Sequence, residues 1–438
     1  MYTASQPLRG TAPILPLLAA LWGWTAVGPA AAVAQDRAIA IRGGTVLPVS
    51  GPAIPGGTVV IQGGKIVAVG AGVAVPSGAE IIDARGKYVM PGVVDAMTNL
   101  GIAPSDLNDA ANPITPAQRV IESYYPYGEF GQGKLGPLRN EEALSGGVTT
   151  MYIAPADGAL IGGQGAVVKT AGPSLDGVIV REPAAMDMTL GTPPKSAARE
   201  RNGDPSTRMA EIAMLRQTLV RAQEYQRSRA DNPAAPRDLD LEALGAVLRR
   251  EMPARIQATS ATDIRSALRL SQEFGFDLVL DGAASAPEFT DELVARRIPV
   301  VLGQVSHPYV SNEEIPDTQD YPPMDEGTPT RLTDAGVKTA IASFSRAFGS
   351  LAPAGTGKWL LVDVSIALGY GMSEDAVLRA VTLTPAEILG VADRIGSLEP
   401  GKDADVLVLD GPPFSIRTWV ETAYVNGELV YRRVSPEP

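Results

Sequence analysis

The sequence contains no cysteine and only one histidine, His307, among its 438 residues. Without cysteine, a disulfide, a thiolate nucleophile and a cysteine-ligated metal are all excluded. Histidine is the commonest metal ligand and a frequent general base, and one copy cannot build a site that needs two or three. The lone histidine is therefore the strongest constraint that composition places on the chemistry.

Positive charge is also scarce, because 37 Lys and Arg are set against 49 Asp and Glu, for a formal net charge of −12. This excess argues against nucleic acid or an anionic membrane surface as the main partner. Hydrophobic residues make up 45% of the chain, beside 46 glycines and 37 prolines, so we predict a sizeable core with many turns.

Only the start of the chain has an apolar run long enough to enter a bilayer. Arg9 precedes the stretch ILPLLAALWGWTAV, no further charge occurs before Asp36, and residues 32–34 read Ala-Val-Ala. This pattern predicts an export signal over residues 1–34, cleaved to leave a periplasmic or secreted protein without stable membrane insertion. The alternative is an uncleaved membrane anchor.

Short apolar runs separated by glycine turns occupy both ends of the remaining chain. Residues 37–90 show this pattern, and residues 395–438 show it again. The second segment contains an Asn-Gly pair at 426–427, which is typical of a hairpin turn. We predict that the two segments pair into one small β-sandwich domain.

Between them, residues 91–394 alternate buried-looking strands with amphipathic helices. A helix should end at Gly275, and a long charged helix is predicted over 206–230. Strand-helix units with right-handed crossovers predict an α/β protein whose (β/α)8 barrel carries insertions at 102–140 and 191–253. Its later strands are expected at 148–154, 254–259, 276–282, 298–304 and 337–343.

Five runs in the chain resemble the amidohydrolase superfamily, especially its imidazolonepropionase-like and prolidase-like members. They are VMPGVVDAMTNLG, GGVTTMYIAP, LIGGQGAVVKTAG, LTPAEILGVADRIGSLEPGKDADVLVLDG and VETAYVNGELVY. The resemblance covers nearly all of the chain after the export segment. It implies a barrel with a small sandwich built from both chain ends, and zinc or another divalent metal held at the carboxyl ends of the barrel strands.

The resemblance also implies the metal-ligand positions, and none of them holds a histidine. The superfamily uses a His-x-His pair after strand one, a carboxylated lysine or glutamate from strand four, histidines from strands five and six, and an aspartate from strand eight. These positions fall at Met97, Asn99, Asp187, Gln257 or Thr259, Gly282 and Phe344. We therefore expect a degenerate member that has lost its metal site and needs no cofactor.

Three titratable residues remain as catalytic candidates, namely Asp187, Asp281 and His307. The two aspartates could perform metal-free acid–base hydrolysis, or bind a hard cation together with Asn99 and Gln257. The simpler interpretation is that they accept hydrogen bonds from loop N–H groups. His307 follows predicted strand seven, where it could act as a base or ligand, or be an ordinary loop histidine.

Two functions follow from these patterns. The first is an exported, non-catalytic homologue that binds a peptide-like or cyclic-amide ligand, or that forms a homo- or hetero-oligomer with an active relative. The second is a hydrolase of carbon–nitrogen bonds that works through Asp187 and Asp281 or through an oxygen-ligated cation.

Overall fold

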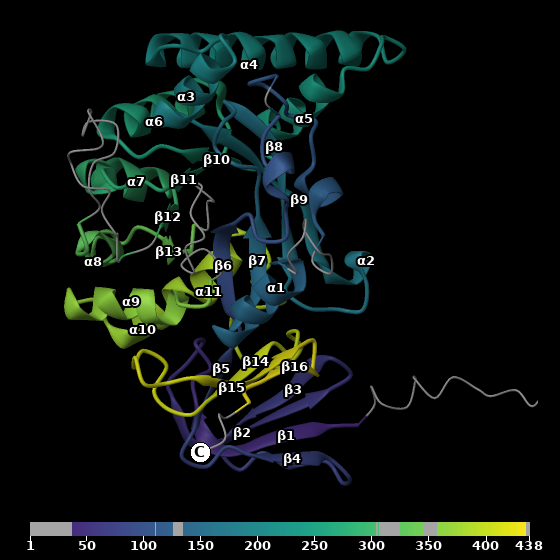
Figure 1. Cartoon of the computed structure of the whole chain (residues 1–438), viewed down its shortest axis with the longest axis vertical. Helices are drawn as coiled ribbons and strands as arrows, with labels where there is room; N and C mark the ends of the chain where they lie inside the picture. Colours follow the sequence, from purple (N-terminus) through teal and green to yellow (C-terminus); the bar gives the residue numbers. More distant parts are fainter. Residues whose placement is uncertain are drawn as a thin grey trace, which may run out of the picture.

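Two eight-stranded sheets organise the chain in the computed structural model (Figure 1). The structure describes residues 37–109, 111–125, 135–303, 305, 325–344 and 357–434. The predicted export segment and His307 lie outside these residues. Within them, every helix is too short or too polar to cross a bilayer.

The first sheet is mixed and joins the two ends of the chain. Its strands follow the order β16-β15-β14-β5-β1-β2-β3, with β4 beside β1. Their bounds are β1 Ile39–Val46, β2 Ile54–Gln62, β3 Lys65–Gly70, β4 Glu80–Asp83, β5 Tyr88–Pro91, β14 Val406–Leu409, β15 Val420–Val425 and β16 Glu428–Arg432. β5 and β14 pair antiparallel, with Met90 opposite Leu407. The predicted pairing of the chain ends is confirmed.

The hairpin β15–β16 shows the local reason for one of these turns. Asn426 and Gly427 connect the strands with φ angles of 49° and 78°. Both lie in the left-handed region, which asparagine and glycine tolerate best and which matches the twist of paired strands.

The second sheet is a barrel with the order β13-β12-β11-β10-β9-β8-β7-β6. Its strands are β6 Val93–Thr98, β7 Val148–Ile153, β8 Ile161–Lys169, β9 Ile179–Thr189, β10 Ala254–Gln257, β11 Leu278–Asp281, β12 Val300–Leu302 and β13 Thr339–Ile341. All five strands predicted at 148–343 are present. Neighbouring pairs are parallel except around β8, which runs antiparallel to both β7 and β9. The α/β barrel fold is confirmed, with one strand reversed.

Residues just after β13 close the barrel against β6. The Phe344 N–H donates to the Met97 carbonyl at 3.1 Å. The N–H and hydroxyl of Ser343 both donate to the carboxylate of Asp95. Burial raises the pKa of Asp95 to about 6, although the hydrogen bonds from Ser343 oppose the rise.

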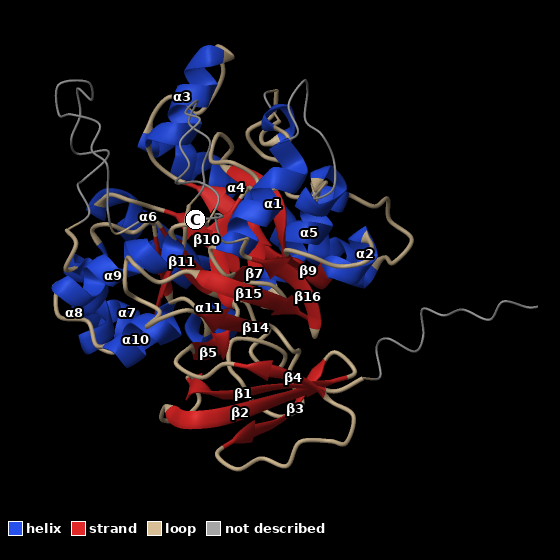
Figure 2. Ribbon diagram, turned by 60° about the horizontal axis from the view of Figure 1, so that its bottom comes forward, coloured by secondary structure: helices blue, strands red, loops and turns tan. Residues whose placement is uncertain are grey.

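Helices cover the outside of the barrel (Figure 2). They are α1 Leu135–Ser145, α2 Leu175–Val178, α3 Thr192–Glu200, α4 Arg208–Asp231, α5 Leu239–Leu248, α6 Ala261–Phe274, α7 Thr290–Arg296, α8 Thr328–Asp334, α9 Leu360–Gly369, α10 Glu374–Ala380 and α11 Leu383–Ile388. The long charged helix is confirmed as α4, which crosses the end of the molecule far from the mixed sheet. α6 begins with Ser260 as its N-cap and ends at Gly275, whose φ is 74°.

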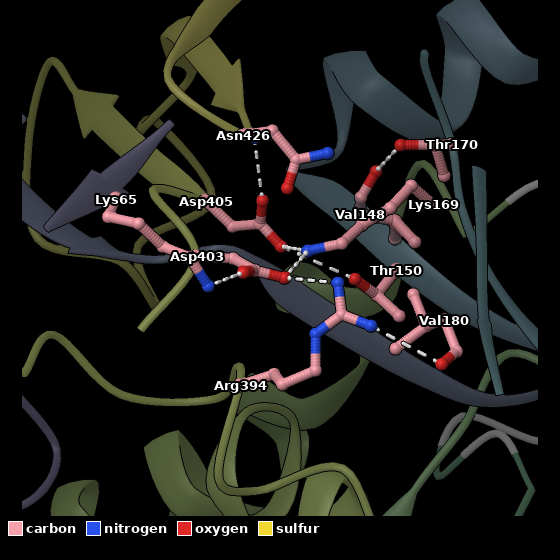
Figure 3. Close-up of polar contacts among 10 residues, drawn as sticks. All are labelled: Lys65, Val148, Thr150, Lys169, Thr170, Val180, Arg394, Asp403, Asp405 and Asn426. Atoms are coloured by element: carbon pink, nitrogen blue, oxygen red, sulfur yellow. Dashed lines mark hydrogen bonds and ion pairs between the residues drawn. The ribbon is translucent and has the colours of Figure 1, made fainter. Parts of the chain in front are cut away.

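A cluster of five charged residues joins the mixed sheet to the near end of the barrel (Figure 3). We call it the floor cluster, and it consists of Lys65, Lys169, Arg394, Asp403 and Asp405. Lys169, at the end of β8, is 1% exposed and pairs with both aspartates. Lys65 and Arg394 also bind Asp403, at 2.6 and 3.0 Å. Burial pushes the pKa of Asp403 upward, but Lys169 and the other cations outweigh it and lower that pKa.

Candidate functional site at the barrel rim

The barrel brings most of the predicted site residues to one end. Asp187 lies near the end of β9, and Gln257 and Asp281 are the last residues of β10 and β11. Met97 and Phe344 lie at the ends of β6 and β13, hydrogen-bonded to each other through their backbones. Because these strands are parallel, their carboxyl ends share one rim, opposite the floor cluster. We call this end the rim.

An ion pair lies inside the barrel just below the rim. Arg255, on β10, donates from Nε and Nη2 to the two oxygens of Asp281 at 2.9 and 2.7 Å. Both residues are 1% exposed. Burial disfavours the charge on Arg255, but Asp281 overcomes that cost and keeps the arginine pKa above its ordinary value. Asp281 thus binds a guanidinium rather than loop N–H groups.

Tyr152, on β7, extends this pair across the barrel. Its hydroxyl donates to Asp187 at 2.7 Å, and the guanidinium carbon of Arg255 lies 4.1 Å from the centre of its ring. Burial, reinforced by the charge of Asp187, raises the tyrosine pKa well above its ordinary value, so the phenol stays protonated. Asp187 and Asp281 are therefore joined through Arg255 and Tyr152. We call these four residues the interior network.

Gly165 on β8 makes room for the interior network. A Cβ atom at this position would lie 2.1 Å from the Tyr152 hydroxyl and 2.7 Å from Asp187 Oδ2. Gly163, two residues earlier, would place a Cβ 2.5 Å from the carbonyl of Gln118. Glycine at these two positions of the run LIGGQGAVVKTAG thus allows a close approach that any larger residue would block.

Two polar atoms at the rim have no hydrogen-bond partner among the described residues. Asn99 Nδ2 is a buried donor, and Gln257 Oε1 is a buried acceptor. The other end of the Gln257 amide donates from Nε2 to Asp157 at 3.4 Å, which fixes its orientation. An unpaired buried polar atom costs free energy, so a ligand that satisfied both atoms would recover that cost.

The remaining rim positions hold apolar side chains, glycine or a threonine. Met97 is buried in the barrel interior, and the ring of Phe344 lies beside Gly282 and Gly303, 3.6 and 3.5 Å from where their Cβ atoms would be. Thr259 is half-buried, and its carbonyl accepts from Ser285. None of these side chains is a good ligand for a divalent metal.

The described rim does not fit a catalytic metal. Nowhere in the described ranges do three or more His, Cys, Asp or Glu side chains converge to hold a metal ion. Asp281 uses both oxygens on Arg255, and Asp187 binds the Tyr152 hydroxyl. A cationic guanidinium lies beside the carboxylates that could otherwise have bound an ion.

Sequence reasoning did not single out Arg255 or Tyr152. A signal was present, because Arg255 is a charged residue inside a short strand whose neighbours, Ala254 and Ile256, are apolar. Because side chains alternate along a strand, apolar neighbours that pack against the helices leave the charged residue pointing into the barrel. A charge buried there needs an acid as its partner. Lys169 at the end of β8 is likewise buried and ion-paired, in the floor cluster.

Comparison with solved structures assigns the family. An amidohydrolase from Thermotoga maritima is 33% identical, with a TM-score of 0.80 over 90% of this chain and 100% of that one. The chain belongs to the amidohydrolase family. A model of that family also matches residues 331–430. A prolidase with a bound phosphonate shares the fold at a TM-score of 0.56, with 19% identity.

Longer relatives share the same region. The amidohydrolase tasK of Hapsidospora irregularis is 27% identical in an alignment 391 residues long, which covers 81% of this chain and 37% of tasK. An imidazolonepropionase of Thermoplasma acidophilum is 29% identical over 120 residues. The chain thus spans about a third of tasK and about a quarter of the imidazolonepropionase.

Proposed function

We propose that this amidohydrolase is an exported, non-catalytic member of its family that binds a peptide-like or cyclic-amide ligand at the barrel rim. The observation that carries the proposal is the ion pair between Arg255 and Asp281, 1% exposed on both sides. A guanidinium supplies positive charge to the barrel interior without a Lewis acid or an exchangeable water. Hydrolysis by this family's chemistry needs both of these.

The unpaired atoms of Asn99 and Gln257 support the choice of ligand. One is a donor and the other an acceptor, and they lie on opposite sides of the rim, after β6 and at the end of β10. An amide offers a carbonyl to the first and an N–H to the second. The aromatic ring of Phe344, beside Gly282 and Gly303 after β11 and β12, provides an apolar contact for the rest of such a ligand.

Metal content is the first test of this proposal. The protein, purified without chelator and without a histidine tag, should contain far less than one equivalent of zinc, manganese or iron per chain. Dipeptides and cyclic amides should bind without being cleaved, and calorimetric affinity should fall in Asn99→Leu and Gln257→Leu.

Two outcomes would overturn it. One is stoichiometric metal together with hydrolysis that a chelator abolishes. The other is metal-free hydrolysis that is lost in Asp187→Asn or Asp281→Asn, which would establish the aspartates as the acid and base of a carbon–nitrogen hydrolase.

A further inference from the structure

Both tryptophans of the described chain meet at the protein surface. Trp359 immediately precedes α9, and Trp419 immediately precedes β15. Their ring centres lie 6.3 Å apart in an edge-to-face arrangement with an interplanar angle of 65°. Each of the two residues remains about 40% exposed. Tryptophan is usually buried over most of its surface, so an exposed pair in contact is an unusual use of apolar area.

Two strongly exposed aliphatic residues lie close to Trp419 or to its partner Arg433 in the sequence. Ile416, in the loop between β14 and β15, is 77% exposed, and Val434, just after β16, is 88% exposed. Ile416 lies three residues from Trp419, and Val434 directly follows Arg433, which stacks on the Trp419 ring. Single exposed aliphatic residues are ordinary, but exposed apolar residues on the same short segments as two exposed tryptophans are typical of an interface.

Cations flank the tryptophans. Lys358 Nζ lies 5.5 Å from the centre of the Trp359 ring, and the guanidinium of Arg433 lies 4.6 Å from that of Trp419. Arg417 is exposed and has no ion-pair partner among the described residues. Asp410 binds Arg433 at 2.9 Å and so offsets one of these three positive charges. The patch is therefore locally positive on a chain whose net charge is −12.

We propose that this tryptophan patch, formed by Lys358, Trp359, Ile416, Arg417, Trp419 and Arg433, is a docking surface for an acidic segment of another protein that carries an apolar side chain. The cations attract the acids and the two rings accept the apolar side chain. Tryptophan and arginine are the residues most often found at the energetic centre of protein interfaces.

Three observations favour this occupant over others. A two-fold contact between copies would bring the positive patch against itself. The acidic net charge opposes approach to an anionic bilayer. In tasK the region similar to this chain belongs to a polypeptide nearly three times as long, so a protein neighbour has a precedent among the relatives. The proposal is independent of the barrel ligand, because no patch residue belongs to a barrel strand.

Tryptophan emission gives a direct test, because the chain from residue 37 onward contains only Trp359 and Trp419. This form is titrated with a synthetic hexapeptide that has two acidic residues on each side of Leu-Phe. We expect a shift in emission and saturable binding. A peptide with glutamine and asparagine in place of the acids should bind at least about tenfold more weakly, because charge complementarity contributes to both encounter and affinity.

Matched charge reversals locate the site. Arg417→Glu and Lys358→Glu should each weaken binding several-fold, whereas Arg265→Glu, an exposed position on α6, should leave it unchanged. Unaltered emission, equal affinity for the neutral peptide, or an equal loss in Arg265→Glu would overturn the proposal. Tighter binding to phosphatidylglycerol vesicles than to the acidic peptide would also overturn it and assign the patch to a lipid surface. Self-association that Trp419→Ala abolishes would assign it to a second copy.

Discussion

Arg255 and Asp281 bind each other at two points, 2.9 and 2.7 Å, inside the barrel of an amidohydrolase. Both side chains are removed from water, so each charge depends on the other. Removing one partner of a buried pair leaves an uncompensated charge, whereas replacing both by apolar groups is often tolerated. This asymmetry makes the pair testable.

Arg255→Met should lower the free energy of unfolding by about 3–5 kcal/mol, because Asp281 is left buried and unpaired. The double variant Arg255→Met, Asp281→Leu should recover most of the loss. Arg331→Met, which breaks the exposed pair with Asp325, should cost less than about 1 kcal/mol. Urea unfolding of the three variants provides the measurement, and equal losses in Arg255→Met and Arg331→Met would contradict a buried pair.

The floor cluster predicts a second contrast between two lysines. Lys169 is buried and is the cation bound to Asp405, whereas Lys65 is half exposed and shares Asp403 with Arg394. Lys169→Met should therefore destabilise the protein by several kcal/mol, and Lys65→Met by less than about 1 kcal/mol. Thermal unfolding should show the difference as a large fall in Tm for the first variant alone. Similar Tm values for the two variants would mean that the cluster does not hold the sheet to the barrel.

Much of this fold was predictable because its signals are local. The strand at 148–153, the helix that ends at Gly275 and the turn at 426–427 each follow from hydrophobic period or from a residue suited to positive φ. The reversed direction of β8 was not predictable, since a strand's own residues do not specify the direction of its neighbours. It depends on the connections, and residues 154–160 return the chain through a short loop instead of a helix.

The same contrast between local and non-local signals applies to the candidate site. Resemblance located the rim positions Met97, Asn99 and Gln257, because they lie at or just after the ends of recognisable strands. The interior network was missed, because it joins Tyr152, Asp187, Arg255 and Asp281 from β7, β9, β10 and β11. Contacts across a barrel depend on which face each side chain takes and how far it reaches, and a single sequence shows neither directly.

Gly165 provides a third prediction, which tests the interior network without removing a charge. Gly165→Ala would place a methyl group 2.1 Å from the Tyr152 hydroxyl, so either β8 or the tyrosine must move. We expect a loss of about 2 kcal/mol or more, typical of overpacking a dense interior. Gly51→Ala, in a surface turn with open space around it, should be neutral within about 0.5 kcal/mol. Unchanged stability in Gly165→Ala would indicate a looser interior than the structure has.

Glu211 on α4 couples the 191–253 insertion to the end of β9. Its Oε2 accepts from the Gly191 N–H at 3.2 Å, while Oε1 is buried without a hydrogen-bond partner among the described residues. Asp263, which binds Arg208, adds a nearby negative charge, and Lys195 and Arg208 supply the positive ones. Burial raises the pKa of Glu211 to about 7, although the hydrogen bond from Gly191 opposes the rise.

This shift predicts that stability falls as pH rises from about 4.5 to about 7. In that window the native state keeps a proton on Glu211 that the unfolded chain has already lost, so deprotonation favours unfolding. Glu211→Gln keeps an oxygen for the Gly191 N–H and removes the charge. It should be more stable than the parent at pH 8, by on the order of 3 kcal/mol since one pKa unit corresponds to about 1.4 kcal/mol. At pH 4 the two proteins should unfold at nearly the same urea concentration. Glu224→Gln, exposed on the same helix, should have the same free energy of unfolding as the parent at every pH. If the difference in stability between the parent and Glu211→Gln did not depend on pH, the proton would not be held at the Glu211 carboxyl.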